Sequence, residues 1–432
     1  MDKTFKITLK SVFFAFLIAA VTIICACGVS PIPHNLRNPL IIVCGIGTAV
    51  YILFKQKSMY LTMSVVLALL SAAYLGISVL YSIDKPATFE LAVVYICSAV
   101  FLLADYPQDL YKKTITAMQV VSIIIAISIV LSVFIDNFML RYFSFIVNPS
   151  NSPDVATAIY QELNWSKAFS GFAREKGEAA FIMNIGIAVY FAKYFSQKKF
   201  RFIDVVGIVL LCAALILTGK RMLFLCPIAV GAVLMLLSNK SGKLVKIIPV
   251  LFLGICGLII TMGFLPQFST IFERFANEES LENLSGRVNL WPYCFEMFGK
   301  NPFLGMGIGT YNRYLELNNI TINGNYWTAH AHNIYYEFLG ELGLIGCVLL
   351  FGGLLMIFGK TVLLLRSKEI TDLEKFLLIF SFSIQLTCFM YCASGNVLLY
   401  KQQIFIWFFV AAISTNITRK YRKLKKGELV NV

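Results

Sequence analysis

The chain reads SGRVNLWPYCFEMFGKNPFLGMGIGTY from Ser285 to Tyr311 and AHAHNIYYEFLGELGLIG from Ala329 to Gly346. Polar, aromatic and glycine residues gather in these two segments, although the chain around them is strongly apolar. They also hold two of the three histidines, His330 and His332. We therefore expect the rest of the chain to be a membrane scaffold that holds this stretch at the outer surface.

Composition places the protein in the membrane class. Of its 432 residues, 58% are hydrophobic and 14% are charged, and the mean hydropathy is +0.77, which is too apolar for an ordinary soluble fold. The net charge of +14 comes from short basic clusters between apolar runs. That pattern is typical of cytoplasmic loops that face anionic lipid, so membrane lipids, and not nucleic acid, are the expected partners.

The apolar runs predict an all-α polytopic membrane protein with about twelve transmembrane helices. The first run is roughly 20 residues long, enough to cross a bilayer. It lacks an A-x-A cleavage site, so we interpret it as an uncleaved helix. The expected spans are 11 to 30, 39 to 54, 58 to 82, 87 to 104, 114 to 135, 177 to 195, 203 to 218, 221 to 238, 244 to 265, 333 to 358, 372 to 394 and 400 to 416.

The distribution of basic residues predicts the orientation. If the N-terminus is cytoplasmic, 24 of the 37 Lys and Arg residues fall in cytoplasmic segments, as the positive-inside rule requires. Both termini then lie in the cytoplasm. Two long polar segments, residues 136 to 176 and 266 to 332, lie outside, and we expect short helices in the second.

Two cationic features on the outer side need a reason. Lys220 and Arg221 lie in the short turn TGKR at residues 218 to 221, where they either snorkel to lipid headgroups or bind an anionic ligand. Arg287 is expected in the first turn of a helix from Gly286 to Phe298 that Ser285 caps. A cation there does not stabilise the helix, so Arg287 is either an anion-binding residue or an exposed arginine near headgroups.

Other residues have structural or chemical alternatives. A histidine at the mouth of a helix can accept a proton near neutral pH, but it can equally pack at the interface. Gly305, Gly307 and Gly309 are expected to let the backbone bend. Glu178 is expected to pair with Arg174 one helical turn away.

No metal site is expected. Two histidines two residues apart could suggest a metal, but no further cluster of cysteine or histidine completes a set of ligands. Ten of the eleven cysteines lie inside apolar runs, where they are small core residues.

The combined motifs resemble the O-antigen ligase and polysaccharide polymerase superfamily. They are TGKR at the start of a helix, then G-R-(x)3-W, N-P-(x)2-G-x-G-x-G, a long outer span, and H-N-(x)7-E-x-G-x-x-G. The close resemblance covers residues 205 to 365, the ligase-like core of a single membrane domain over residues 1 to 432. It implies a fold like that of the GT-C glycosyltransferases.

The resemblance also implies an activity. Members transfer a glycan from an undecaprenyl-pyrophosphate donor at the outer face of the bacterial cytoplasmic (inner) membrane, without a cofactor. The essential arginines of the family align with Arg221 and Arg287, and its essential histidine aligns with His332. These three are the predicted catalytic residues. The predicted substrate-binding residues are Lys220, His330, Asn333 and Arg174.

Two questions stay open at the level of sequence. Ligases use lipid A core as acceptor and polymerases use another lipid-linked glycan. Ligases often have a serine where this chain has Lys220, which slightly favours a polymerase for capsule or exopolysaccharide. The alternatives from other classes are a transporter or lipid-linked glycan flippase, and a membrane assembly partner without catalysis. No matching halves are visible, and polar residues gather in an outer loop rather than at the bilayer midplane, which disfavours transport.

Overall fold

The computed structural model describes residues 8–28, 32, 34–56, 61–135, 137–148, 152–153, 157, 168–196, 201–237, 284–322, 325–326, 330–367 and 369–425. These residues form α-helices joined by short turns, with one two-stranded hairpin. The helices are α1 (Leu9–Cys25), α2 (Arg37–Lys55), α3 (Met63–Ser78), α4 (Lys85–Ala99), α5 (Gln108–Phe134), α6 (Phe138–Val147), α8 (Lys176–Ser196), α9 (Phe202–Leu217), α10 (Arg221–Leu237), α14 (Trp291–Lys300), α15 (Tyr311–Leu317), α16 (Ile334–Leu365), α17 (Asp372–Cys392) and α18 (Lys401–Lys425). Strand β1 (Thr321–Ile322) pairs antiparallel with β2 (Asn325–Tyr326).

Short 3₁₀ segments flank several helices: η1 (Ala26–Gly28), η2 (His34–Leu36), η3 (Val100–Leu103) and η4 (Leu284–Asn289). The helical class predicted from the sequence is therefore confirmed. Seven helical stretches of the described chain are long and apolar enough to cross a membrane: Leu9–Gly28, Arg37–Lys55, Lys85–Leu103, Gln108–Phe134, Lys176–Ser196, Ile334–Leu365 and Asp372–Cys392.

The remaining predicted spans fall into three groups. Those at 58 to 82, 203 to 218 and 221 to 238 correspond to the shorter apolar helices α3, α9 and α10. The span at 400 to 416 corresponds to the first part of α18, which begins at Lys401, and the span at 244 to 265 lies outside the described residues. The total of twelve spans stays a prediction.

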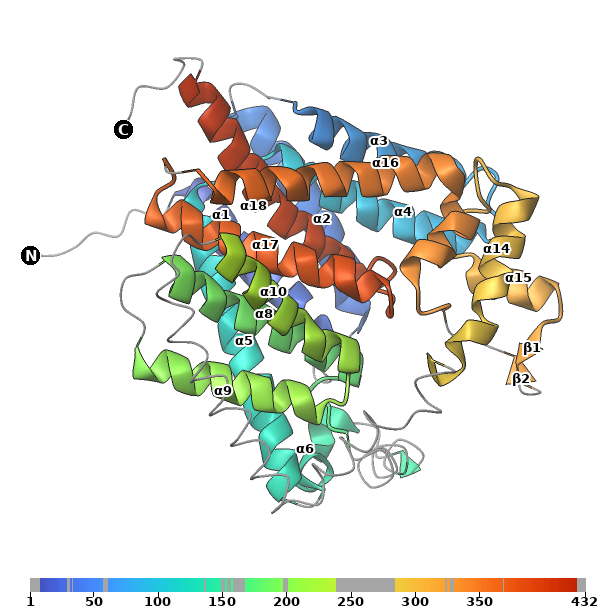
Figure 1. The fold of residues 1–432 in the computed structure, drawn as a ribbon, viewed down its shortest axis with the longest axis horizontal. Helices are drawn as coiled ribbons and strands as arrows, with labels where there is room; N and C mark the ends of the chain where they lie inside the picture. Colours follow the sequence, from blue (N-terminus) through green and yellow to red (C-terminus); the bar gives the residue numbers. More distant parts are fainter. Residues whose placement is uncertain are drawn as a thin grey trace, which may run out of the picture.

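The bundle has two ends with different contents. The ring of Phe14 on α1 packs 6.1 Å from that of Tyr106, and Arg419 near the end of α18 bonds to Asp105 at 2.7 Å. The start of α1 and the end of α18 therefore meet at one end. Helices α14 and α15 and the hairpin lie at the other end (Figure 1). This arrangement fits the predicted topology, although the side of the membrane on which each end lies stays a prediction.

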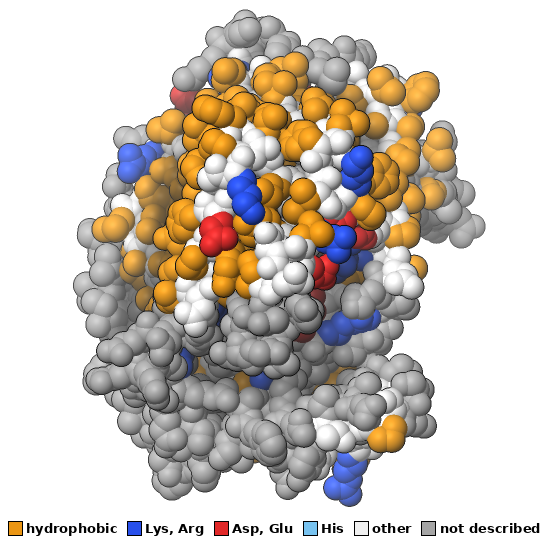
Figure 2. All heavy atoms as spheres, turned by 90° about the vertical axis from the view of Figure 1, so that its right-hand side faces the viewer, with side chains coloured by type: hydrophobic (Ala, Val, Ile, Leu, Met, Phe, Trp, Pro, Cys, Tyr) orange, Lys and Arg blue, Asp and Glu red, His pale blue; other side chains and the backbone are white. Residues whose placement is uncertain are grey.

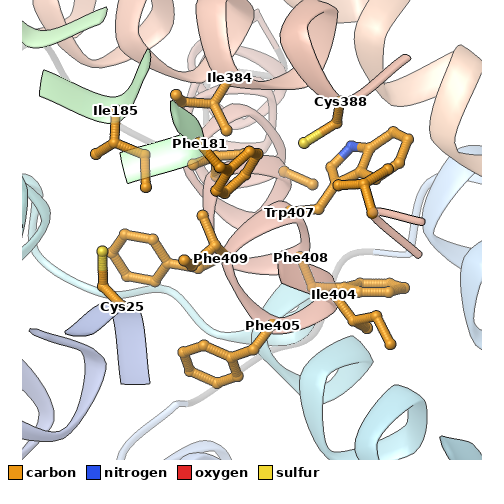
Figure 3. Close-up of a cluster of buried hydrophobic side chains, with 14 of the residues drawn as sticks. Cys25, Phe181, Ile185, Ile384, Cys388, Ile404, Phe405, Trp407, Phe408 and Phe409 are labelled. Atoms are coloured by element: carbon orange, nitrogen blue, oxygen red, sulfur yellow. The ribbon is translucent and has the colours of Figure 1, made fainter. Parts of the chain in front are cut away.

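Helix α18 runs through the centre of the bundle. Four of its aromatic residues, Phe405, Trp407, Phe408 and Phe409, are buried together with Phe181 of α8 and with cysteines of α1 and α17 (Figure 3). A helix that is apolar on all sides packs in an interior. Peripheral helices instead direct leucine and phenylalanine outward, as a lipid-facing surface requires.

Close helix packing depends on small residues. Ser64 and Ser71 of α3 are buried, and α3 packs against α16. A Cβ at Gly353 of α16 would lie 2.8 Å from the backbone nitrogen of Ala68. Without a strong hydrophobic force between helices in lipid, such close approach supplies the packing energy.

Helix α16 is broken near its start. Gly343 has a φ of 62°, and its neighbour Leu344 donates its N–H to the carbonyl oxygen of Pro302 at 2.8 Å. The part after the break, from Leu344 to Leu365, spans roughly 33 Å at 1.5 Å per residue, enough to cross the hydrocarbon thickness of about 30 Å. The part before the break is therefore available to hold the outer segment.

Candidate functional site

The TGKR turn places two cations at the start of α10. Gly219 adopts a φ of +66°, which a glycine tolerates without strain, and Arg221 is the first residue of the helix. A Cβ atom on Gly177 would lie 3.8 Å from Cε of Lys220 and 3.3 Å from the hydroxyl oxygen of Tyr391. The starts of α8 and α10 and the end of α17 therefore meet around Lys220.

Arg287 joins this group from a distant part of the chain. Its Nη1 donates a hydrogen bond of 3.0 Å to the carbonyl oxygen of Ser394, in the connection between α17 and α18. Burial lowers the pKa of Arg287; the charge of Tyr391 opposes this effect and the charge of Arg221 adds to it. The two predicted arginines are thus close enough to repel each other.

The helix expected from Gly286 to Phe298 is wrong in its limits. The chain forms the 3₁₀ segment η4 first, and α14 begins at Trp291 with Leu290 as N-cap residue. Pro292 explains the break, because proline suits the first turn of a helix but disrupts its interior. Arg287 accordingly lies in η4 and not in the first turn of a longer helix.

His332 lies beside these cations in a strained backbone conformation. Its φ is 55°, which is uncommon for a residue with a side chain and marks a position held by its surroundings. Its Nδ1 is 3.3 Å from Nδ2 of Asn396. Burial, followed by the charges of Arg287, Lys220 and His330, lowers the pKa of His332 to about 4. The imidazole is therefore neutral at pH 7.

His330 has the opposite environment. Its Nδ1 lies 2.8 Å from Oε1 of Glu337, which is fully buried. The other carboxylate oxygen accepts the N–H of Ala331 at 2.9 Å. Burial lowers the pKa of His330, but the charge and hydrogen bond of Glu337 and the charge of Glu341 together raise it above its usual value. The two histidines therefore prefer different protonation states.

A second carboxylate of α16 holds the glycine-rich segment. Oε2 of Glu341 accepts the N–H of Gly309 at 2.8 Å, and Oε1 accepts that of Tyr311 at 2.9 Å. Gly305 has a φ of +70°, and a Cβ there would lie 2.3 Å from the carbonyl oxygen of Glu341. The expected bend of the backbone at these glycines is confirmed, because Gly307 and Gly309 also have positive φ.

Five of the seven predicted site residues lie together: Arg221, Lys220, Arg287, His332 and His330. The charge of Arg221 lowers the pKa of Arg287, and the charges of Arg287, Lys220 and His330 lower that of His332.

The other two predicted residues have structural partners. The side-chain oxygen of Asn333 accepts the N–H groups of Tyr335 and Tyr336 and so caps α16. Arg174 donates from Nη2 to the carbonyl oxygen of Ile32, next to the connection between α1 and α2. Their assignment as substrate-binding residues stays a prediction.

The ion pair expected between Arg174 and Glu178 is replaced by a longer-range contact. Oε1 of Glu178 accepts a hydrogen bond of 2.6 Å from Nε2 of Gln402. The oxygen of that amide accepts from Nη1 of Arg37 at 2.8 Å. The predicted partner of Glu178 lies one helical turn away, whereas the observed partner lies more than 200 positions away in the sequence.

Sequence reasoning missed the contribution of the connection between α17 and α18. This segment supplies Ser394 to Arg287 and Asn396 to His332. The available signal was the run SGNVLLY from Ser394 to Tyr400, a polar interruption between the last two predicted spans.

An apolar surface surrounds this end of the molecule. Hydrophobic side chains cover much of its described surface, with a few charged groups between them (Figure 2). Phe295 and Val288 are exposed, and they line an open hollow of about 620 Å³ with Trp291, Pro292 and Glu296. Nε1 of Trp291 donates to the carbonyl oxygen of Ala331 at 3.2 Å, which ties this face of α14 to the two histidines.

The part of the chain that the structure describes contains no group of three His, Cys, Asp or Glu side chains that could hold a metal ion. The chemical character of the site is instead cationic, with one neutral imidazole. Such a site can bind an anion and accept a proton.

The comparisons with known proteins agree with the sequence motifs. A family model described as O-antigen ligase matches residues 206–351, from α9 into α16. No curated protein matches the chain. The family match supports the O-antigen ligase and polymerase superfamily, and it implies an activity of the glycosyltransferase type. Together with the apolar helices, it indicates a multi-pass protein of the inner membrane.

Proposed function

Because residues 206–351 carry an O-antigen ligase domain, we propose that the protein transfers a glycan from an undecaprenyl-pyrophosphate donor to an acceptor at the outer face of the cytoplasmic membrane. The observation that carries the proposal is that Arg287 and Lys220 lie close enough to the neutral His332 to lower its pKa, while Arg221 lies close enough to Arg287 to lower that pKa in turn. Such a transfer creates negative charge on the leaving diphosphate, which the cations stabilise, and releases a proton from the acceptor hydroxyl, which the imidazole accepts.

The cations bind the leaving group. As the bond between the anomeric carbon and the phosphate oxygen breaks, negative charge develops on the lipid diphosphate. Arginines suit this charge, because guanidinium groups stay protonated and bind phosphate through two parallel hydrogen bonds. The N-terminus of α10, at Arg221, adds amide groups and the positive end of a helix dipole.

His332 accepts the proton. The acceptor hydroxyl attacks the anomeric carbon, its oxygen forms the new glycosidic bond, and its proton moves to the imidazole. A direct displacement inverts the anomeric configuration. The bound diphosphate offsets the charges of Arg287 and Lys220, which lower the pKa of His332 in the free protein. Donor binding therefore makes this histidine a stronger base.

His330 has a different task in this proposal. Its contact with the buried carboxylate of Glu337 raises its pKa, so His330 holds a proton more readily than His332 does. Two like side chains with pKa values shifted in opposite directions are a common arrangement of acid and base groups in enzymes.

The lipid part of the donor fits the apolar surface of this end. The hollow lined by Val288, Trp291 and Phe295 begins one residue after Arg287. A polyprenyl chain on that surface keeps its diphosphate near the guanidinium group and its hydrocarbon out of water.

We favour the polymerase reaction over ligation to lipid A core. Lys220 occupies the position before the first arginine, where ligases of the family often have serine. A lysine adds positive charge for a second lipid diphosphate, which a polymerase must accommodate because its acceptor is lipid-linked as well.

The test uses purified protein in liposomes with an undecaprenyl-pyrophosphate repeat unit, with and without lipid A core. Chain growth without the core supports the polymerase, whereas transfer that requires the core identifies a ligase. Movement of the lipid-linked glycan between leaflets with neither reaction would contradict the proposal and favour a flippase. Arg313→Ala is the matched control, because Arg313 is an exposed arginine of the same end that pairs with Glu316.

A further inference from the structure

Asn396 lies at a fixed place beside the proposed base. It belongs to the connection between α17 and α18, where its side chain is 2% exposed. Its own carbonyl oxygen accepts the N–H groups of Leu399 and Tyr400 at 2.9 and 3.2 Å. These two bonds form a tight turn that fixes the backbone from which the amide side chain extends toward His332.

The hydrogen-bond pattern of this amide leaves one atom without a partner. Nδ2 of Asn396 faces Nδ1 of His332 at 3.3 Å, while the buried Oδ1 has no hydrogen-bond partner. A buried acceptor without a donor is unfavourable. Rotation of the amide by a half turn exchanges oxygen and nitrogen at no cost in shape, and the two atoms are assigned by their hydrogen bonds.

The choice between the two orientations decides the chemistry of the imidazole. If Nδ2 donates to Nδ1 of His332, the ring must carry its proton on Nε2, and that atom cannot then act as a base. If Oδ1 accepts from the N–H at Nδ1, the lone pair of Nε2 is free. The second orientation gives the oxygen a donor and leaves the amide nitrogen in the position that has no hydrogen-bond partner.

On the premise of the proposed glycosyl transfer, we propose that Asn396 is a positioning residue that accepts the Nδ1 proton of His332 and thereby keeps Nε2 available for the acceptor hydroxyl. One further contact supports this assignment. The same connection binds Arg287 through Ser394, so one short segment aligns the base with a diphosphate ligand.

The tautomer of His332 is the direct readout. The chain has only three histidines, so ¹⁵N-histidine NMR of the full-length protein in lipid can be assigned by loss of signal in His332→Ala. We expect His332 with Nδ1 protonated and Nε2 unprotonated at pH 7. In Asn396→Ala, we expect the Nε2-protonated form to increase. A wild-type ring protonated at Nε2, or a tautomer unchanged in the variant, overturns the proposal.

Activity and its pH dependence provide the second readout. Asn396→Ala should lower kcat about 10²- to 10⁴-fold with little change in KM, the range for loss of an oriented base. Asn396→Asp should recover much of this loss, because a carboxylate accepts the same proton. Its negative charge should also move the acid limb of the pH profile to higher pH. Asn396→Asp that is as inactive as the alanine variant, or that leaves the pH limb unmoved, contradicts the proposal.

Apart from the carboxylate that Asn396→Asp adds, the charged groups around His332 stay constant in these variants. They are Arg287 from η4, Lys220 from the turn before α10, and His330 from the same segment. Asn318→Ala is the control, because Asn318 is an exposed asparagine of the same end whose side chain donates to the carbonyl oxygen of Tyr314 in α15. It should change neither the tautomer nor the rate.

The experiments distinguish a failure of the proposed function from a failure of the positioning role of Asn396. If the wild-type protein transfers no glycan, the proposed function is wrong, while the NMR result still tests the role of Asn396. If the wild-type protein is active and His332→Ala is not, but the Asn396 variants keep the tautomer and the pH profile, the positioning role alone is wrong. Thermal unfolding of each variant identifies any that does not fold.

Discussion

Two arginines at opposite ends of the bundle differ in what surrounds them: Arg419 is buried and Arg287 is half-buried. Arg419 is 1% exposed; its Nε bonds to Asp105 at 2.7 Å, and its Nη2 bonds to the carbonyl oxygen of Ala104 at 2.6 Å. Arg287 has an uncharged carbonyl as its hydrogen-bond partner, and Arg221 is close enough to lower its pKa.

The difference separates a structural cation from one available to a ligand. A buried charge is tolerated when an opposite charge and hydrogen bonds compensate for its desolvation. The environment of Arg419 meets this requirement within the protein. The positive charge of Arg221 destabilises the charged form of Arg287. An anion bound beside them would stabilise it. The contrast therefore predicts opposite consequences for the same substitution at the two ends.

The largest expected effect is the loss of transfer on replacing the site residues. Arg287→Ala, Arg221→Ala and His332→Ala should each lower kcat at least about 10³-fold, since each removes stabilisation of the transition state or the proton acceptor. The amount of folded protein in the membrane should not change. Transfer assays with matched protein levels check this, and Arg313→Ala should retain the wild-type rate. Normal rates in all three variants would contradict the proposed difference between the ligand-binding cations at one end and the structural Arg419 at the other.

Arg419→Ala should give the converse result. It removes the ion pair with Asp105, whose side chain is 28% exposed, so the loss of stability should lie below the roughly 3–5 kcal/mol that is typical of a fully buried pair. The apparent melting temperature should fall, while the transfer rate per folded molecule should stay near the wild-type value. An Arg419 variant that is stable but inactive would show that the two arginines do not differ as described.

Gly305 tests how the outer segment is held. In Gly305→Ala, the new Cβ would meet the backbone of Glu341, at a position whose φ is +70°. A residue with strained φ costs of order 1–3 kcal/mol, and the displaced segment should also lower activity. Gly299→Ala is the matched control, because a Cβ there meets nothing within 4 Å. Equal stability of the two variants would contradict the docking of this segment on α16.

The pH dependence reports the low pKa of His332. Because the neutral imidazole is the base, activity is lost as pH falls through its pKa. In the free protein that value is about 4, so the limb of kcat/KM that belongs to His332 should lie well below the usual pKa of about 6.5. The anionic donor should shift the corresponding limb of kcat to higher pH. Coincident limbs near pH 6.5 would show that the cations do not act on His332.

The smallest expected effect is that of a chelator. If guanidinium groups stabilise the diphosphate, transfer should continue in EDTA at the rate measured without it. Loss of activity that a divalent ion restores would mean that a metal shares this task.

Local features of the fold could be predicted from the sequence, and long-range contacts could not. The length of an apolar run is a local property, so the helices that contain the predicted spans were found. The helix expected from Gly286 was wrong because Pro292 moved its start. The partner of Glu178 was wrong because Gln402 comes from α18, far along the chain.

The site was predictable only in part for the same reason. The family motifs predicted Arg221, Arg287 and His332 as site residues, but no spacing in the sequence implied that they meet. In the structure, the connection between α17 and α18 contacts both Arg287 and His332, through Ser394 and Asn396. Asn396 was missed because its importance depends on one contact with a residue 64 positions away.

The central claim is that the cations at the outer end hold the diphosphate of a lipid-linked donor next to His332. Its most direct test is solid-state NMR of ¹⁵N-arginine-labelled protein in lipid with undecaprenyl-pyrophosphate glycan, which detects dipolar coupling between ³¹P and guanidinium nitrogen. We expect coupling in the wild-type protein that is reduced in Arg287→Ala and in Arg221→Ala and unchanged in Arg313→Ala. The absence of coupling in the wild-type protein, or full coupling in both site variants, would contradict the claim.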